Sequence, residues 1–287
     1  MRDDYVTRAI HLALEEDIGT GDVTSTVTVP AGTRASGEFL AKSHGVVSGL
    51  DVASRTFRAV DPGVEFAALV GDGDRVSPGE RIARVFGEAR SLLAAERVAL
   101  NFLQRLSGVA TATARYAEAV AGTGAWVIDT RKTTPGMRLM EKAAVRHGGG
   151  RNHRFGLSDG ILIKDNHLAA IGGPDRIARA IAAARSGAPH TLRVEVEVTT
   201  LDELEQALVA GADAVLLDNM AVDVMAEAVR RTRGRAILEA SGGITLETVR
   251  RVAETGVDLV SVGALTHSAP SLDISLELAL DTGGTDR

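Results

Sequence analysis

The second half of this chain alternates short apolar runs with helical patterns, and this alternation constrains the fold more than any other feature. The apolar runs lie at 125–130, 160–165, 193–198, 213–218, 235–240 and 258–263. Helical patterns lie between them, at 138–147, 174–186, 201–210, 222–233 and 246–255. Near-continuous apolar strands that alternate with helices indicate a parallel sheet covered by helices.

Two of these strand–helix units resemble each other. The pattern Leu201-x-x-Leu204…Gly211-x-Asp213 matches Leu246-x-x-Val249…Gly256-x-Asp258. A repeated unit of this kind favours a (β/α) barrel over an open doubly wound sheet. Only about six strands are visible, so either the barrel is incomplete or this pattern misses some of its strands.

The first part of the chain has a different pattern. Residues 5–16 predict an amphipathic helix, and β-like runs separated by turn signals follow between 37 and 86, with a helical stretch at 50–60. From 89 to about 121 an apolar-periodic segment predicts one or two helices, broken near Ser107-Gly108.

Composition excludes several functional classes. The 287 residues carry a net charge of −6, which argues against a general nucleic-acid or anionic-membrane binder. The chain has no cysteine, which excludes disulfides, thiolate zinc sites, iron–sulfur clusters and thiol catalysis. No apolar run is long enough to span a bilayer. The N-terminal segment carries charges throughout, where a signal peptide would need an uninterrupted apolar stretch. We therefore expect a cytoplasmic protein that binds neither membrane nor nucleic acid.

This acidic chain contains one strongly basic segment, between Thr130 and Arg154. Lysine is rare, yet Lys132, Lys142 and Lys164 all fall near this segment, in a chain that otherwise uses arginine. The segment begins at the end of a predicted strand, where active sites lie in barrels. Cations that converge there suit a polyanionic small molecule. The alternative is a solvated basic loop, which the position at a strand end disfavours.

Acidic and glycine-rich segments follow the later strands. Glu195 and Glu197 point the same way by strand alternation, and Asp218 ends the next strand. Carboxylates beside a cationic pocket bind ribose hydroxyls, hold Mg²⁺ or stabilise positive charge at a reacting carbon; the alternative is salt bridging to arginine. Ser241-Gly242 and Gly263-Ala264 each lie between a strand and a helix, where backbone N–H groups bind phosphate; the alternative is ordinary turn glycine.

These motifs together resemble the quinolinate phosphoribosyltransferase (decarboxylating) family, also called nicotinate-nucleotide pyrophosphorylase. The resemblance spans nearly the whole chain. It is most specific at Asp129-Thr-Arg-Lys-Thr-Thr-Pro-Gly136, Gly148-Gly-Gly-x-Asn-His-Arg154, Leu162-Ile-Lys-Asp-Asn-His167, Glu195-Val-Glu197, Leu217-Asp-Asn219 and Ser241-Gly-Gly243.

The resemblance implies an α/β fold with an N-terminal α/β sandwich domain at 1–118 and an incomplete (β/α) TIM-like barrel at 119–270. A C-terminal helix and tail at 271–287 would pack back on the N-terminal domain. The implied activity is that of a pentosyltransferase that converts quinolinate and phosphoribosyl pyrophosphate to nicotinate mononucleotide, pyrophosphate and CO₂, with Mg²⁺, in NAD biosynthesis.

The resemblance also implies roles for individual residues. Quinolinate carboxylates would be bound by Arg131, His153, Arg154 and Lys164, with Lys132 as a catalytic cation near pyrophosphate. Arg97 would reach in from the partner of a homodimer, and a hexamer is possible. Glu197 and Asp218 would be catalytic carboxylates that hold ribose hydroxyls and Mg²⁺. The 5′-phosphate would lie in a cradle of Ser241, Gly242, Gly263 and Ala264, with His267 following that loop.

Two departures and two alternatives remain. Ala143 replaces a frequent aromatic residue and Met137 a usual leucine, which bears on local packing rather than on charge.

One alternative is a related phosphoribosyltransferase with another acceptor, such as nicotinate, or the relative linked to molybdenum transport, against which the Lys164–His167 stretch argues. The other is a non-catalytic phosphosugar-binding protein, which the retained acids Glu197 and Asp218 argue against.

Overall fold

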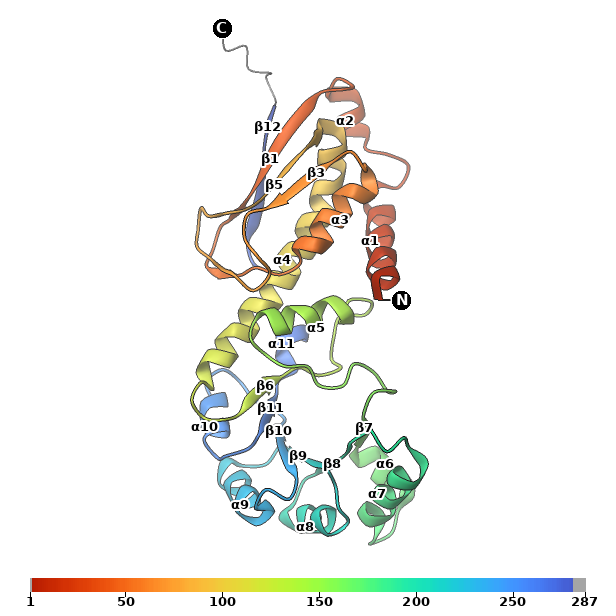
Figure 1. The fold of residues 1–287 in the computed structure, drawn as a ribbon, viewed down its shortest axis with the longest axis vertical. Helices are drawn as coiled ribbons and strands as arrows, with labels where there is room; N and C mark the ends of the chain where they lie inside the picture. Colours follow the sequence, from red (N-terminus) through yellow and green to blue (C-terminus); the bar gives the residue numbers. More distant parts are fainter. Residues whose placement is uncertain (1, 281–287) are drawn as a thin grey trace. The chain divides into compact units, whose positions relative to one another are not determined.

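The computed structural model describes residues 2–280, which form two compact units (Figure 1). The first comprises the described residues up to Ala114, Thr133–Gly149 and the described residues from Thr266 onward. The second comprises Arg115–Lys132 and Gly150–Leu265. The boundaries predicted at 118 and 270 differ from this division, because the chain passes between the units several times. A hydrophobic pattern read along the sequence does not reveal such returns.

The second unit is built on six parallel strands, at the positions that the apolar runs predict. They are β6 (Trp126–Ile128), β7 (Ile161–Ile163), β8 (Val194–Val198), β9 (Ala214–Asp218), β10 (Ile237–Ser241) and β11 (Leu259–Ser261). Their order in the sheet is β6-β11-β10-β9-β8-β7. Among the described residues β6 and β7 do not pair with each other, so the prediction of an incomplete barrel is confirmed.

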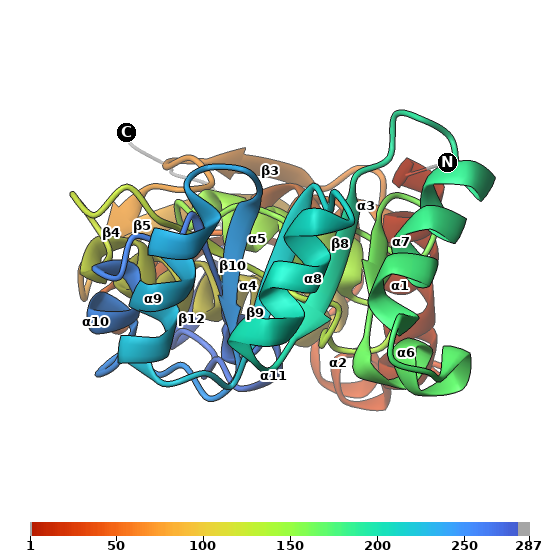
Figure 2. The same ribbon diagram turned by 90° about the horizontal axis from the view of Figure 1, so that it is seen from below.

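Helices cover the outer side of this sheet (Figure 2). They are α6 (Asp165–Ile171), α7 (Arg176–Gly187), α8 (Leu201–Val209), α9 (Val222–Thr232) and α10 (Val249–Ala253). Every residue of β8 is buried, as expected for a parallel strand with both faces covered. The sequence pattern predicts four of these helices and misses the short α6.

The sequence repeat corresponds to a repeated hydrogen-bond arrangement. Gly211 and Gly256 both adopt positive φ after the helices that precede β9 and β11. The following aspartates each bond to an earlier strand: Asp213 accepts from the N–H of Val194 and Asp258 from the N–H of Leu238, both at 2.8 Å. Each aspartate therefore fixes the start of its own strand in register with the neighbouring strand.

The first unit contains an antiparallel sheet in the order β12-β1-β5-β3. Its strands are β1 (Arg34–Ala41), β3 (Glu65–Ala68), β5 (Arg81–Glu88) and β12 (Ile274–Leu280), and a small pair is formed by β2 (Gly45–Val46) and β4 (Arg75–Val76). Its helices are α1 (Arg2–Ile18), α2 (Val23–Thr28), α3 (Leu50–Val60), α5 (Arg138–His147) and the greater part of α4 (Ala89–Ala119). Phe39 of β1 packs edge-on against Phe57 of α3 in the core between sheet and helices.

The C-terminal segment corrects one prediction. Residues 271–287 were expected to begin with a helix, but Ile274–Leu280 form the strand β12, antiparallel to β1. The alternation of Ile274, Leu276 and Leu278 with other residues is a strand pattern that accounts for this outcome. The segment does return to the N-terminal sheet, while the tail at 281–287 lies outside the described residues.

The helix α4 is continuous through the break predicted at Ser107-Gly108. It is the longest helix, with 31 residues, yet within residues 2–280 no helix is both long and apolar enough to cross a bilayer. Gly108 serves close packing: a Cβ at this position would lie 2.0 Å from the carbonyl oxygen of Pro270. The glycine therefore marks where the C-terminal segment crosses the helix.

We expect Gly108→Ala to lower the free energy of unfolding, because overpacking against a backbone carbonyl costs about 1–3 kcal/mol. Gly187→Ala is the matched control, since Gly187 ends α7 with open space around its Cα. The control should be neutral, or more stable by at most about 1 kcal/mol. Urea denaturation measures both, and equal stability of the two variants would contradict this account of Gly108.

Candidate active site

The parallel strands bring most of the predicted site residues to one edge of the barrel unit. The residues at or just after the carboxyl ends of strands are Lys164, Glu197, Asp218, Ser241, Gly242, Gly263 and Ala264. Arg131 and Lys132 follow β6 in the same unit, and His153 and Arg154 lie before β7. Arg97 is the exception: it lies exposed on α4 in the other unit.

An ion pair forms between two neighbouring strands of this edge. The Lys164 ammonium contacts the Oε2 atom of Glu197. The Glu197 side chain is 8% exposed, whereas that of Lys164 is 45% exposed. The backbone N–H of Lys164 donates to Nδ1 of His167 at 2.9 Å, which orders the start of α6. The pair thus places one positive charge at the barrel opening with its carboxylate partner beneath.

Asp218 and Ser241 lie opposite each other in the register of β9 and β10. The next residue, Asn219, has φ of +54°, an uncommon conformation for a residue other than glycine. Its N–H donates to the Ser241 carbonyl at 2.9 Å, and its amide donates to Asp218 at 3.0 Å. Gly242 has φ of +93°, and a Cβ there would also lie 2.2 Å from Asn219 Oδ1, so this turn favours a glycine. The turn leaves the Asp218 carboxylate partly exposed at the strand end.

The positive charges of Arg131 and Arg154 are close enough to repel each other. Burial lowers the pKa of Arg154, and the positive charge of Arg131 lowers it further. Arg154 also donates through Nη1 to the Gly160 carbonyl at 3.0 Å, which fixes its side chain. Arg131 and Lys132 lie exposed on the loop after β6. Like charges held together in this way favour an anionic ligand between them.

His153 lies inside the barrel between two acids. Its Nε2 is 3.0 Å from Glu195 Oε2 and 3.3 Å from Glu239 Oε2. Its backbone N–H donates to the buried carboxylate of Asp129 at 2.8 Å. The N–H of Arg154 points at its Nδ1, at 2.7 Å. Both ring nitrogens therefore have partners.

The acid pair controls the charge of the ring. Burial lowers the pKa of His153, but the hydrogen bonds and charges of Glu195 and Glu239 outweigh burial and raise it to about 10. Burial raises the pKa of Glu195, and the hydrogen bond with His153 opposes this. The Arg154 N–H favours an unprotonated Nδ1, but two carboxylates within 3.3 Å are the stronger influence and favour the imidazolium.

Two sets of residues have ligand atoms that suit a metal. His153, Glu195 and Glu239 have donor atoms within 4.8 Å of one another, and over residues 2–280 this is the group that converges closely enough to hold an ion by itself. They help line a cavity of about 420 Å³. Glu197 and Asp218 lie on adjacent strands but contribute one carboxylate each. Such a pair suits Mg²⁺, which usually takes one or two carboxylates together with substrate phosphates.

Several residues of this region were not assigned a role from the sequence. Asp129 was seen only as part of a motif, yet its buried carboxylate also accepts from Asn152 Nδ2 at 2.6 Å. Glu239 was not singled out, although an acid within the apolar run at 235–240 is a signal of a buried, partnered group. The positive φ of Asn219 has no clear signal in a single sequence.

The sequence matches two family models that together cover most of the chain. The C-terminal domain of quinolinate phosphoribosyl transferase matches residues 109–277, and the N-terminal domain matches residues 22–107. The chain belongs to the quinolinate phosphoribosyltransferase family.

Relatives in the family are similar over nearly their full length. A probable nicotinate-nucleotide pyrophosphorylase [carboxylating] of Bacillus subtilis (strain 168) is 45% identical over 265 residues, which cover 92% of this chain and 90% of that protein. The mitochondrial quinolinate phosphoribosyltransferase [decarboxylating] 2 of Nicotiana glauca is 42% identical, covering 96% of this chain and 83% of the relative.

Two solved structures share the fold to different degrees. NadC from Streptococcus pyogenes has a TM-score of 0.90 at 45% identity, covering 95% of this chain and 96% of that one. Human nicotinic acid phosphoribosyltransferase has a TM-score of 0.62 at 16% identity, which indicates a shared fold alone.

We expect the His153 ring to stay protonated at pH 8 in this family member. Its pKa in the folded state, about 10, lies above the ordinary 6.5, so protonation stabilises the folded protein. That stabilisation is complete below pH 6.5 and is lost as the pH rises towards 10. NMR titration of the ring protons measures it, with His153→Asn to assign the signal. A ring that titrates between pH 6 and pH 8 would contradict the expectation.

Proposed function

We propose that this protein transfers phosphoribosyl from phosphoribosyl pyrophosphate to quinolinate with decarboxylation. The products are nicotinate mononucleotide, pyrophosphate and CO₂, in NAD biosynthesis. The observation that carries the proposal is the collection of cations and acids at the strand ends of a barrel whose sequence belongs to this family. The family relatives that match over most of their length are named for this reaction.

The cationic residues suit a dicarboxylate. Arg131 and Arg154 would bind quinolinate carboxylates, together with the Lys164 ammonium. Since both nitrogens of His153 have partners, we assign it no direct hydrogen bond to quinolinate. The same cations would stabilise the negative charge that CO₂ loss leaves on the ring carbon, and exclusion of water by bound substrates would strengthen this effect.

The remaining residues suit the phosphosugar. Departure of pyrophosphate leaves positive charge on the ribose, and the carboxylates of Glu197 and Asp218 would stabilise it and bind the ribose hydroxyls. Lys132 would stabilise the leaving pyrophosphate as a compact point charge. The backbone around Ser241, Gly242, Gly263 and Ala264 would hold the 5′-phosphate.

Magnesium fits these residues. Asp218 is partly exposed and Glu197 lies on the adjacent strand, so both offer hard oxygen ligands where the substrate phosphates would enter. When bound there, Mg²⁺ would neutralise charge on the departing pyrophosphate.

The assembly is part of the proposal. Arg97, exposed on α4, would complete the site of a partner subunit in a homodimer, and the family resemblance also allows a hexamer. A cytoplasmic location, expected from the sequence, is also part of the proposal.

A product assay tests the reaction. The protein, Mg²⁺ and phosphoribosyl pyrophosphate are incubated separately with quinolinate, nicotinate or nicotinamide, and the products are separated by chromatography. We expect nicotinate mononucleotide and CO₂ from quinolinate alone. Product from nicotinate alone would overturn the assigned acceptor, and absence of any product despite binding of phosphoribosyl pyrophosphate would favour a non-catalytic binding protein.

A mixing experiment tests the shared site. We expect Arg97→Ala and Lys164→Ala each to be inactive, because each removes a cation from every site of the homodimer. Mixed dimers of the two variants would contain one intact site, so the mixture should regain about a quarter of wild-type turnover for random pairing and one active site in each mixed dimer. No recovery, with subunit exchange shown by mass spectrometry, would contradict the role of Arg97.

A further inference from the structure

A buried carboxylate holds the chain just after the basic loop. The Glu141 side chain, on α5, is fully buried, and each of its oxygens is hydrogen-bonded. Its Oε2 accepts from the backbone N–H of Thr134 at 3.0 Å, and its Oε1 accepts from the Thr134 hydroxyl at 2.7 Å. Burying a carboxylate is costly unless it is fully partnered, so this arrangement tolerates little displacement of Thr134.

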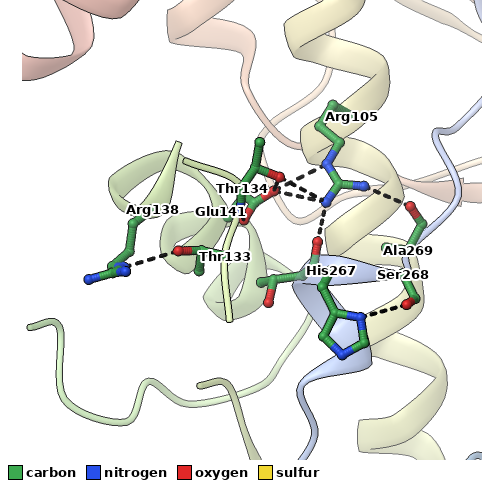
Figure 3. Close-up of polar contacts among 9 residues, drawn as sticks. Arg105, Thr133, Thr134, Arg138, Glu141, His267, Ser268 and Ala269 are labelled. Atoms are coloured by element: carbon green, nitrogen blue, oxygen red, sulfur yellow. Dashed lines mark hydrogen bonds and ion pairs between the residues drawn. The ribbon is translucent and has the colours of Figure 1, made fainter. Parts of the chain in front are cut away.

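Arg105 of α4 supplies the countercharge and reaches a second segment (Figure 3). Its Nε and Nη2 donate to Glu141 Oε1 at 3.1 and 2.9 Å. Its Nη1 donates to the Ala269 carbonyl at 2.7 Å, and Nη2 also contacts the Thr266 carbonyl. Thr266 belongs to the short helix α11 (Ala264–His267), whose last carbonyls have no partner within the helix. The planar guanidinium therefore joins α5 to the end of α11.

The two anchored segments adjoin two different parts of the proposed site along the chain. Thr134 follows Lys132 by two residues, and Thr266 follows Ala264 by two residues. The basic loop has a further tie, because Arg138 Nε donates to the Thr133 hydroxyl at 3.0 Å (Figure 3). A fixed point two residues away restricts the backbone positions open to Lys132 and to Ala264.

We infer that Arg105 and Glu141 are positioning residues for phosphoribosyl transfer, which jointly fix the pyrophosphate-side loop at Lys132 and the 5′-phosphate loop at Ala264. This inference rests on the proposed function. Neither residue is assigned to a substrate: Glu141 acts through Thr134, and Arg105 acts through the carbonyls of Thr266 and Ala269 and through Glu141.

Two conservative variants separate the two loops kinetically. Glu141→Gln keeps the volume but cannot accept hydrogen bonds through its NH₂ group, so the Thr134 end is released. Its kcat should fall at least about tenfold, since misplacement by about 1 Å costs up to about a hundredfold in rate.

Arg105→Lys keeps the charge near Glu141 but cannot donate to both carbonyls. Its KM for phosphoribosyl pyrophosphate should rise at least about fivefold, with a smaller change in KM for quinolinate.

A matched control removes another ion pair of the same kind. Arg84 of β5 and Glu38 of β1 pair at 3.0 Å in the first unit, and neither adjoins a proposed site residue along the chain. Glu38→Gln should leave kcat and both KM values unchanged. Melting curves of all variants show that each is folded at the assay temperature. Should Glu141→Gln fail to fold, Thr134→Val removes only the hydroxyl contact and should lower kcat in the same direction.

The outcomes separate this inference from the proposed function. Wild-type turnover, together with the split between kcat and KM in the two variants, supports the inference. Wild-type turnover with unchanged kcat and KM in folded variants shows a purely structural pair and overturns the inference alone. No product from the wild-type protein overturns the proposed function and the inference together.

Discussion

Parallel hydrogen bonding among β6–β11 is the constraint on which the candidate site depends. Parallel strands all end at the same edge, so residues far apart in the chain, such as Lys164, Glu197 and Asp218, are brought to one region without any direct sequence relation. The register is reinforced by Asp213 and Asp258, whose carboxylates accept hydrogen bonds from backbone N–H groups of the neighbouring strands β8 and β10. A change in register by one residue would turn Glu195 and Glu197 out of the barrel.

Much of the barrel could be predicted from the sequence, because its strands are buried on both faces and read as apolar runs. The same logic located the strand-end residues of the candidate site, whose individual roles stay predictions. The sequence could not predict which side chains contact each other. The acids that contact His153 lie on β8 and β10, in segments more than forty residues away. Gly108 was taken as a helix break because glycine has low helix propensity, whereas a tertiary contact with Pro270 explains it.

Several buried carboxylates in residues 2–280 lie beside a cationic side chain. Glu141 has Arg105, Glu197 has Lys164, and the two acids near His153 share its ring. Buried ion pairs of this kind are a poor way to gain stability, since apolar side chains of equal volume would do at least as well. Such a composition is therefore best understood as a requirement of ligand binding rather than of folding.

The pairing of β1 with β12 has a consequence for synthesis of the chain. Phe39, near the beginning, lies opposite Leu276, near the end, so one edge of the N-terminal sheet has no partner until almost the entire polypeptide has been made. An unpaired strand edge is a template for association with other chains. During translation this edge would be open to wrong pairing, and loss of the last strand by truncation would leave it open permanently.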